Sequence, residues 1–446
     1  MGPFGDHALM KALKPFLTTT VWVSLGKAGG ILVPFLIALL YGASPATDAF
    51  FFSYSLIIAL MTIFSHVFEL SLVPFLVERK ENADQAAAFA VSILKRGLPV
   101  CFLIGMVIAL ALPFLLGLRA AIPAETSALI PRFFWEMLPG LFIASLISAY
   151  HGFFYAYKIF WFPSVSTLFR TSTMILFFLF GREALGIHAL TWGFVAGEGV
   201  RWLAAQAVFM RRFSLRFKFN APDFQPTSAF FKQAFYQVFA GVAINMMPIA
   251  DQWAAAPLGP GKLSLFNYAD RLIQIPYLLF FYGFTQVFFS LWSESHSQEK
   301  TLLFFEKIQK DMRRVFVGVC FFVLMVILLS DPMIRLVFQR SHLTQDQLQQ
   351  ILYLFLWLTL GFVPGVFRIL YGRILIITQK SKIYLCQAWV ELLAKIALNF
   401  LLARRFGIAG IPMATLIIYS LSVLWFHFFV RHQTLVQGHP KGKGIN

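Results

Sequence analysis

Charged residues are scarce in this chain. Asp, Glu, Lys and Arg make up 13% of its 446 residues, whereas 59% of the residues are hydrophobic. Soluble domains carry about 25% charged and about 45–50% apolar residues. With a mean hydropathy of +0.73 and 53 phenylalanines, a soluble fold would have to expose much of its apolar surface to water. We therefore predict an integral membrane protein.

Cysteine is almost absent, and so are the common catalytic and metal-binding motifs. The three cysteines lie in or beside apolar segments without metal-site spacing, which favours a packing role for Cys101, Cys320 and Cys386. The sequence contains no GxxxxGK[ST], HExxH or GxSxG string. We therefore expect a protein that is not an enzyme, without catalytic residues, metal or cofactor.

The excess of basic residues, 37 Lys and Arg against 20 Asp and Glu, does not gather into one motif or tail. It recurs in short polar breaks between apolar runs, which indicates membrane topology rather than nucleic-acid binding. Lys and Arg are most frequent in the breaks that are cytoplasmic if both termini lie inside. We predict cytoplasmic termini, no nucleic-acid partner, and binding of the basic clusters to anionic membrane lipids.

Long apolar runs are what the sequence has in abundance. A transmembrane helix needs roughly 20 apolar residues, because it rises 1.5 Å per residue and must cross about 30 Å of hydrocarbon. Suitable segments lie near 17–41, 48–77, 96–118, 133–156, 161–181, 187–210, 230–257, 265–292, 315–338, 350–378, 383–403 and 408–430. The expected fold class is an all-α polytopic membrane protein, with about twelve transmembrane helices in two parallel six-helix lobes around a central cavity.

A polar stretch divides these spans into two sets of six. We expect an N-terminal lobe at 1–210, a cytoplasmic linker at 211–228, a C-terminal lobe at 229–431 and a cytoplasmic tail at 432–446. Six spans return each half to the side where it began, so the halves would be parallel repeats. The strings YGASPATDAFFFSYSLI and LGPGKLSLFNYADRLI echo each other weakly and support this repetition.

A few ionisable residues fall inside the predicted spans, where each costs at least ~2.5 kcal/mol and calls for a partner or a wet cavity. Arg271 is the strongest site candidate, because a guanidinium binds phosphate in a forked, bidentate manner. Its neighbour Asp270 cannot face the same way on a helix, so at least one of the two points toward a cavity or another helix. The structural alternative for Arg271 is a salt bridge to Asp251 or Glu69.

Other buried polar residues have both a functional and a structural interpretation. Lys27 lies mid-span beside three glycines, which permit either a cavity or close helix packing. Asp48 follows a helix start, so it is either a cavity residue or an N-terminal cap. His66 and His151 could relay protons, although a lone histidine is more often a hydrogen-bonded interior residue.

Charge pairs within single helices have a structural interpretation. Glu198 and Arg201 are three residues apart, and Glu391 and Lys395 are four apart, so each pair can neutralise itself. We therefore expect structural pairing for both. The possible ion or charge partners of the site are Glu69, Asp251 and Arg368.

Two parts of the sequence resemble a known family. YGASPATDAFF with SLVPFLVERK downstream, and LFNYADRLIQIP in the eighth span, resemble the MurJ (MviN) lipid II flippase family. The resemblance implies the multidrug/oligosaccharidyl-lipid/polysaccharide exporter fold, with two lobes around a central cationic cavity. The implied substrate is a polyprenyl pyrophosphate that carries a sugar–peptide headgroup.

The family's site residues carry over in part. Arg271 falls on the cavity arginine of the YADRL string, Asp48 on the aspartate of TDAFF, and Lys27 on the first arginine of the first helix. The second arginine of that helix is Val33 here, and Met and Thr at 61–62 replace the arginine pair of the second helix. Members commonly have fourteen helices, whereas twelve are predicted here. The resemblance therefore implies a cavity with fewer phosphate-binding cations.

We predict a secondary-type transporter that flips lipid II, or a related lipid-linked glycan, across the bacterial inner membrane by alternating access. The expected partners are this substrate, membrane lipids and cell-wall synthesis proteins, and the sequence identifies no coupling ion. Two alternatives remain open. One is a non-transporting scaffold of the cell envelope, and the other is a cation or drug antiporter of the same fold, which would need acidic cavity residues.

Overall fold

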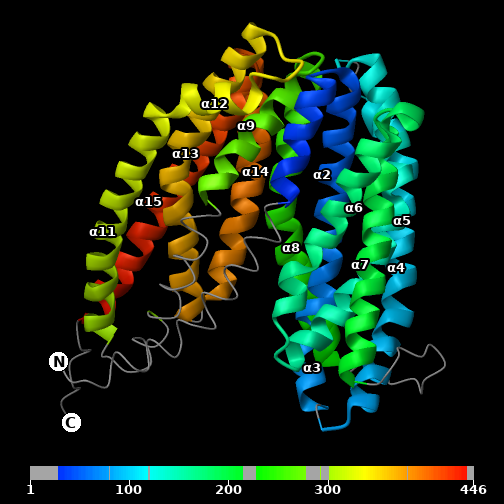
Figure 1. The fold of residues 1–446 in the computed structure, drawn as a ribbon. Helices are drawn as coiled ribbons and strands as arrows, with labels where there is room; N and C mark the ends of the chain where they lie inside the picture. The colour runs from blue at the N-terminus through cyan, green and yellow to red at the C-terminus, as the bar shows by residue number, and fades with distance from the viewer. Residues whose placement is uncertain are drawn as a thin grey trace. The chain divides into compact units, whose positions relative to one another are not determined.

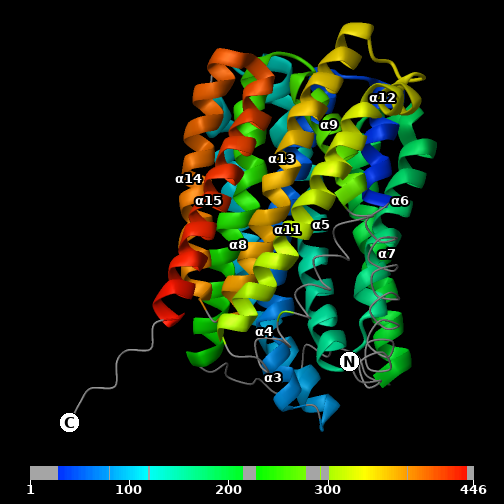
Figure 2. The same cartoon turned by 90° about the vertical axis from the view of Figure 1, so that its left-hand side faces the viewer.

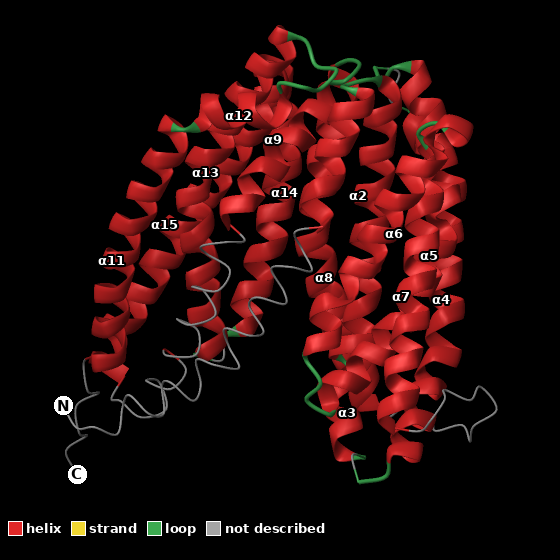
Figure 3. Ribbon diagram, viewed as in Figure 1, coloured by secondary structure: helices red, strands yellow, loops and turns green. Residues whose placement is uncertain are grey.

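The computed structural model describes residues 29–79, 81–118, 121–213, 228–277, 292, 301–378 and 380–438. Across these ranges the chain forms helices joined by turns and short loops, and no strand occurs there (Figure 3). The prediction of an all-α fold is confirmed. The helices form two compact units, Met1–Ser264 and Leu265–Asn446.

The first unit is built around α5. Its elements are the helical segment Gly29–Tyr41, α2 Pro45–Ser65, η1 His66–Leu70, α3 Val73–Glu78, α4 Ala83–Gly117, α5 Ala124–Ala156, α6 Trp161–Leu185, α7 His188–Phe213, α8 Ser228–Ala255 and η2 Ala256–Leu258. α5 packs against α2, α4 and α7, while α6 lies along α7 (Figure 1). Of an apolar stretch of 18 residues in α5, 78% is buried, whereas only 28% of the corresponding α4 stretch is buried. α5 is thus a core helix, and α4 presents apolar side chains outward.

The start of α2 follows from its local sequence. The Ser44 hydroxyl accepts a hydrogen bond from the Thr47 N–H at 3.3 Å, and Thr47 Oγ1 accepts one from the Ser44 N–H at 2.8 Å. This reciprocal capping box satisfies backbone donors that would otherwise lack a partner. Pro45 occupies the first turn, where its missing N–H costs nothing.

α2 ends in η1, a π-helical turn. The Ser71 N–H donates to the His66 carbonyl at 3.1 Å, five residues back along the chain. Three glycines let neighbouring helices approach this turn closely. A Cβ at Gly97 on α4 would lie 2.5 Å from the Phe68 ring, one at Gly152 on α5 would lie 2.9 Å from the Phe68 carbonyl, and one at Gly241 on α8 would lie 2.6 Å from His66 Nδ1. The π-turn is therefore enclosed by α4, α5 and α8.

The second unit is a group of long helices. They are α9 Lys262–Pro276, whose first turn still belongs to the first unit, α11 Thr301–Leu328, α12 Ser330–Phe338, α13 Gln345–Ile377, α14 Ser381–Phe406, the 3-10 turn Gly407–Ala409 and α15 Gly410–Gly438. α15 packs against both α13 and α14 (Figure 2). Gly407, with φ of +61°, makes the sharp turn between α14 and α15. The chain bends by 55° between α11 and α12.

Length and composition mark several of these helices as membrane spans. Six helical segments of the described ranges are long and apolar enough to cross a bilayer, or seven if α11 and α12 together form one span. The polytopic fold class is therefore confirmed, while the number of twelve spans stays a prediction. The lobe boundary at 211–228 also stays a prediction, because residues 214–227 lie outside the described ranges.

Candidate functional site

A cavity of about 230 Å³ lies inside the second unit, among α9, α13 and α15. Three of its lining residues are Asp270 and Gln274 of α9 and Tyr277, which directly follows α9. Their spacing of four and three residues places them on one face of the helix. Arg368 lines the cavity from α13 and Thr415 from α15. Small-molecule sites usually measure about 300–1,000 Å³. This cavity is therefore smaller than the usual site of a small-molecule ligand.

Gln274 connects the two charged residues of α9. Its Nε2 donates to Asp270 Oδ2 at 2.7 Å, and its Oε1 accepts from Arg271 Nη1 at 2.8 Å. Asp270 lines the cavity, as one residue of this adjacent pair was expected to do, while both side chains bond to Gln274. Arg271 Nε is buried and has no hydrogen-bond partner among the described residues. Its guanidinium thus meets a neutral amide and keeps donor capacity for an anion.

Arg368 is neutralised, in contrast to Arg271. Its Nε lies 2.9 and 2.8 Å from the two carboxylate oxygens of Glu391 on α14, Nη2 also donates to Glu391, and the guanidinium lies 5.3 Å from the centre of the Tyr419 ring. Arg368 is an ion-pair partner of Glu391 that was not predicted from the sequence, and the pairing of Glu391 with Lys395 stays a prediction. Lys395 donates to the hydroxyl of Thr415, at the cavity wall.

Asp48 joins two segments that are far apart in the sequence. Its Oδ2 accepts from the Gly261 N–H at 2.6 Å, and its Oδ1 accepts from the N–H and hydroxyl of Ser264 at 2.7 and 2.6 Å. Ser44 and Thr47 cap the helix of Asp48 itself, whereas Asp48 caps the first turn of α9. The structural interpretation as a cap thus applies to a different helix from the one expected. A substrate contact by Asp48 stays a prediction.

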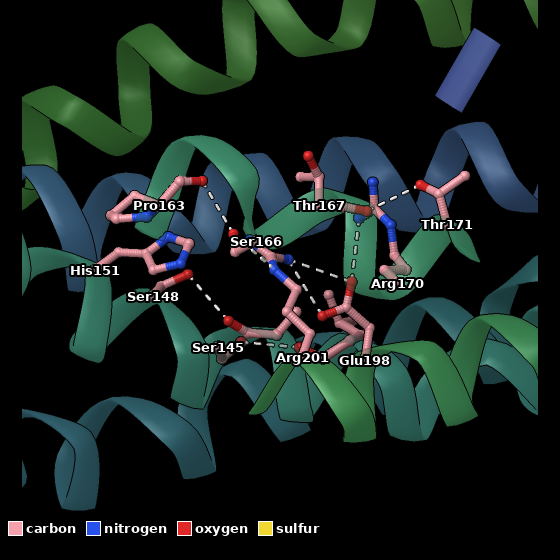
Figure 4. Close-up of polar contacts among 12 residues, drawn as sticks. Ser145, Ser148, His151, Pro163, Ser166, Thr167, Arg170, Thr171, Glu198 and Arg201 are labelled. Atoms are coloured by element: carbon pink, nitrogen blue, oxygen red, sulfur yellow. Dashed lines mark hydrogen bonds and ion pairs between the residues drawn. The ribbon is translucent and has the colours of Figure 1, made fainter. Parts of the chain in front are cut away.

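A buried ionic cluster ties α6 to α7 in the first unit (Figure 4). Glu198 is fully buried and accepts from Arg170 Nη1 at 3.1 Å and from Arg201 Nη1 at 3.2 Å, and Arg201 Nε donates to Ser166 at 3.2 Å. A Cβ at Gly197 would lie 2.5 Å from the Arg170 carbonyl, so only glycine allows this approach. The predicted Glu198–Arg201 pair is confirmed, with Arg170 as an additional partner.

The structure places the remaining predicted residues separately. Lys27 lies outside the described residues. Asp251 is half-buried on α8, and Glu69, on η1, lies 3.6 Å from His151. Sequence reasoning missed Gln274, although its spacing of three and four residues from Arg271 and Asp270 is the signal for such a bridge. Substrate binding by the site residues stays a prediction.

Comparison with known proteins identifies the family. Residues 37–443 match the family model described as lipid II flippase MurJ. The chain belongs to the MurJ family. A probable lipid II flippase MurJ of Buchnera aphidicola subsp. Acyrthosiphon pisum is 23% identical over 448 residues, covering 96% of this chain and 84% of the relative. A MurJ of Thermotoga maritima, with the same description, is 23% identical and covers 92% and 84%.

Solved structures agree with the MurJ assignment at the level of the fold. A lipid II flippase MurJ in an inward closed conformation superposes with a TM-score of 0.79, at 19% identity over 93% of this chain and 87% of that one. An inward-facing multidrug resistance MATE family transporter of the MOP superfamily gives a TM-score of 0.72, at 14% identity over 95% and 96%. The predicted resemblance to the MurJ family is confirmed by the family model. The likeness to the MATE transporter shows a shared fold.

Proposed function

We propose that this chain translocates a polyprenyl-pyrophosphate-linked cell-wall precursor, lipid II or a related lipid-linked glycan, across the bacterial inner membrane. Membership of the MurJ family supports this cargo class. The chain acts as a transporter that alternates access between the two sides, with both termini in the cytoplasm. Its expected partners are the lipid-linked substrate, the surrounding lipids and proteins of cell-wall synthesis.

The observation that carries the proposal is the state of Arg271. A buried guanidinium is normally paired with a carboxylate, as Arg368 is with Glu391. The half-buried Arg271 instead meets Gln274 through Nη1, and its buried Nε has no partner among the described residues. Keeping such a cation inside the bilayer costs free energy unless an anion binds to it. We assign this role to the pyrophosphate, with Lys27 as a second contact.

The drive for translocation comes from outside the chain's own chemistry, because its sequence carries no phosphate-binding GxxxxGK[ST] loop. Moving one charge through the membrane potential supplies about 2.3 kcal/mol per 100 mV, which is enough to bias a transport cycle. Consumption of the product on the outer face would add to this bias.

The test is translocation of a fluorescent lipid II analogue by the full-length protein in reconstituted vesicles. We expect Arg271→Ala to abolish most of the activity and Arg271→Lys to keep only part of it, because an ammonium lacks the forked donor geometry. The matched control is Arg335→Ala on α12, whose side chain is 67% exposed and paired with Asp331. Full translocation by Arg271→Ala would refute the proposal, and transport of an organic cation instead of the lipid would favour an antiporter.

A further inference from the structure

A buried histidine in the first unit has an incomplete set of hydrogen bonds. His151 on α5 is 4% exposed, and its Nε2 has no hydrogen-bond partner among the described residues. Its Nδ1 lies 3.6 Å from Glu69 Oε2, beyond the 2.7–3.2 Å of a formed N–H···O bond. Buried polar atoms are nearly always bonded. This imidazole therefore keeps a place for one more proton.

The same unit contains a second histidine–carboxylate pair, whose contact has hydrogen-bond distance. His188 Nδ1 lies 2.8 and 2.9 Å from the two oxygens of Glu136, and the Thr191 hydroxyl donates to the same carboxylate at 2.5 Å. Arg132 adds a contact at 3.5 Å. The gap between His151 and Glu69 is thus a property of that pair, because the half-buried His188 forms its contact with Glu136 at hydrogen-bond distance.

Charged groups surround His151 on several sides. Glu69 faces it from η1, and Arg201 and Glu198 face it from α7. Two uncharged rings lie near it as well. The ring centres of Phe162 on α6 and Tyr155 on α5 are 6.1 and 6.5 Å from the centre of the imidazole ring. On η1, His66 faces Glu69 in turn, and its Nδ1 is buried without a partner in the described part of the chain.

The formal charges of this region balance when its histidines are neutral. Glu69 and Glu198 supply two negative charges, and Arg170 and Arg201 supply two positive ones. One added proton makes the region positive by one charge. Glu69 keeps 19% of its side chain exposed, whereas His151 keeps 5%. Glu69 is therefore the more exposed group of the pair.

We propose that Glu69 and His151 form a proton-binding site and that the proton is the coupling ion of the flippase. The inference rests on the proposed function, whose coupling ion it names. In neutral imidazole one ring nitrogen carries hydrogen and the other carries a lone pair. The incoming proton binds that lone pair, so that both nitrogens become donors. Nδ1–H then donates to Glu69, and the 3.6 Å gap closes into a charge-assisted hydrogen bond.

The position of Glu69 on the π-turn connects this local step to the helices around it. Gly152 follows His151 directly, and a Cβ there would lie 2.9 Å from the Phe68 carbonyl and 3.2 Å from the Glu69 carbonyl. The backbone of η1 thus rests directly on α5 without intervening side chains. The Glu69–His151 pair thus lies where the backbone of η1 contacts α5. π-turns of this kind recur at functional sites.

The first arm of the test measures protonation without transport. The full-length protein is labelled with ¹⁵N in its histidine rings and placed in nanodiscs, and the His151→Asn variant assigns the His151 signals by difference. Imidazole and imidazolium have distinct ¹⁵N shifts. We expect imidazolium at His151 to appear between about pH 8 and 5, with a smaller imidazolium fraction at each pH in Glu69→Gln. A His151 that stays neutral down to about pH 5 would overturn the proposal.

The second arm measures translocation of the lipid II analogue with and without an imposed pH gradient. The gradient changes the rate for the native protein and for the control His342→Asn, whose histidine is exposed. Glu69→Gln and His151→Asn are expected to show equal rates with and without the gradient. Retained gradient dependence in both variants, or none in the native protein, would overturn proton coupling. Absence of any translocation would instead refute the proposed function, and the spectra alone would then decide whether the proton site exists.

Discussion

The buried ion pair of Arg368 and Glu391 gives a prediction with a defined magnitude. Their side chains are 12% and 2% exposed, and the guanidinium contacts both carboxylate oxygens. Removing one partner of a buried pair leaves a desolvated charge and costs about 3–5 kcal/mol. Glu391→Gln keeps the side-chain shape and removes only the charge. We therefore expect it to lower the free energy of unfolding by about 3–5 kcal/mol.

Replacing both partners tests whether the cost comes from the uncompensated charge. An apolar pair of similar volume, Arg368→Met with Glu391→Met, leaves no buried charge, and such replacements are often neutral or stabilising by about 1–4 kcal/mol. The double variant is thus expected to be more stable than either single variant. The matched control is Asp331→Asn, which breaks an exposed pair with Arg335 and should cost about 0–1 kcal/mol.

The assay is reversible unfolding of the purified protein in mixed micelles at one protein concentration. It compares Glu391→Gln, the single variants Arg368→Met and Glu391→Met, their double variant, and the control Asp331→Asn. A non-additive double-mutant cycle is the expected signature of two side chains in direct contact. The reasoning is refuted if Glu391→Gln costs no more than Asp331→Asn. It is also refuted if the double variant is as unstable as the sum of the two single variants.

Three further predictions concern the first unit, and each is measured by the same unfolding assay. Asp48→Ala removes the acceptor of three hydrogen bonds at the start of α9 and should cost about 3 kcal/mol or more; a change within about 0.5 kcal/mol would contradict the capping role. Gly152→Ala places a methyl group against the backbone of η1 and should lower the free energy of unfolding by about 1–3 kcal/mol. Its control, Gly318→Ala, has open space around it and should be neutral or stabilising by up to about 1 kcal/mol. Equal effects of the two substitutions would show that the contact at η1 is unimportant. Glu198→Gln leaves its two arginine partners facing each other and should cost about 3–5 kcal/mol, and native-like stability would contradict the cluster's structural role.

The fold class was predictable from the sequence because hydropathy is a local property. Each span is a continuous apolar run. Helices such as α5 and α13 can therefore be predicted from their own residues, without reference to the rest of the chain. The Glu198–Arg201 pair was predictable for the same reason, because three residues on a helix share a face. The prediction of helix number depends on segments such as 278–291, which lie outside the described residues.

Partners contributed by other helices were not predictable in this way. Arg170 reaches Glu198 across 28 residues, Arg368 reaches Glu391 across 23, and Asp48 reaches Ser264 across 216. Nothing in the local pattern around Glu391 points to Arg368, because that contact depends on how α13 packs against α14. The π-turn at η1 was also not predicted, and the glycines that let three other helices approach it are distant from it in the sequence.

The hydrogen bonds of Asp48 affect how future mutational data on this family should be interpreted. Asp48 belongs to the TDAFF string and holds the first turn of α9, the helix that carries Arg271 about two turns further on. Loss of translocation in an Asp48 variant would therefore not show that its carboxylate touches the cargo. A search that relies on TDAFF selects chains able to start α9 correctly, whatever those chains carry. Only stability and translocation measured together on the same variant can separate a misplaced helix from a lost substrate contact.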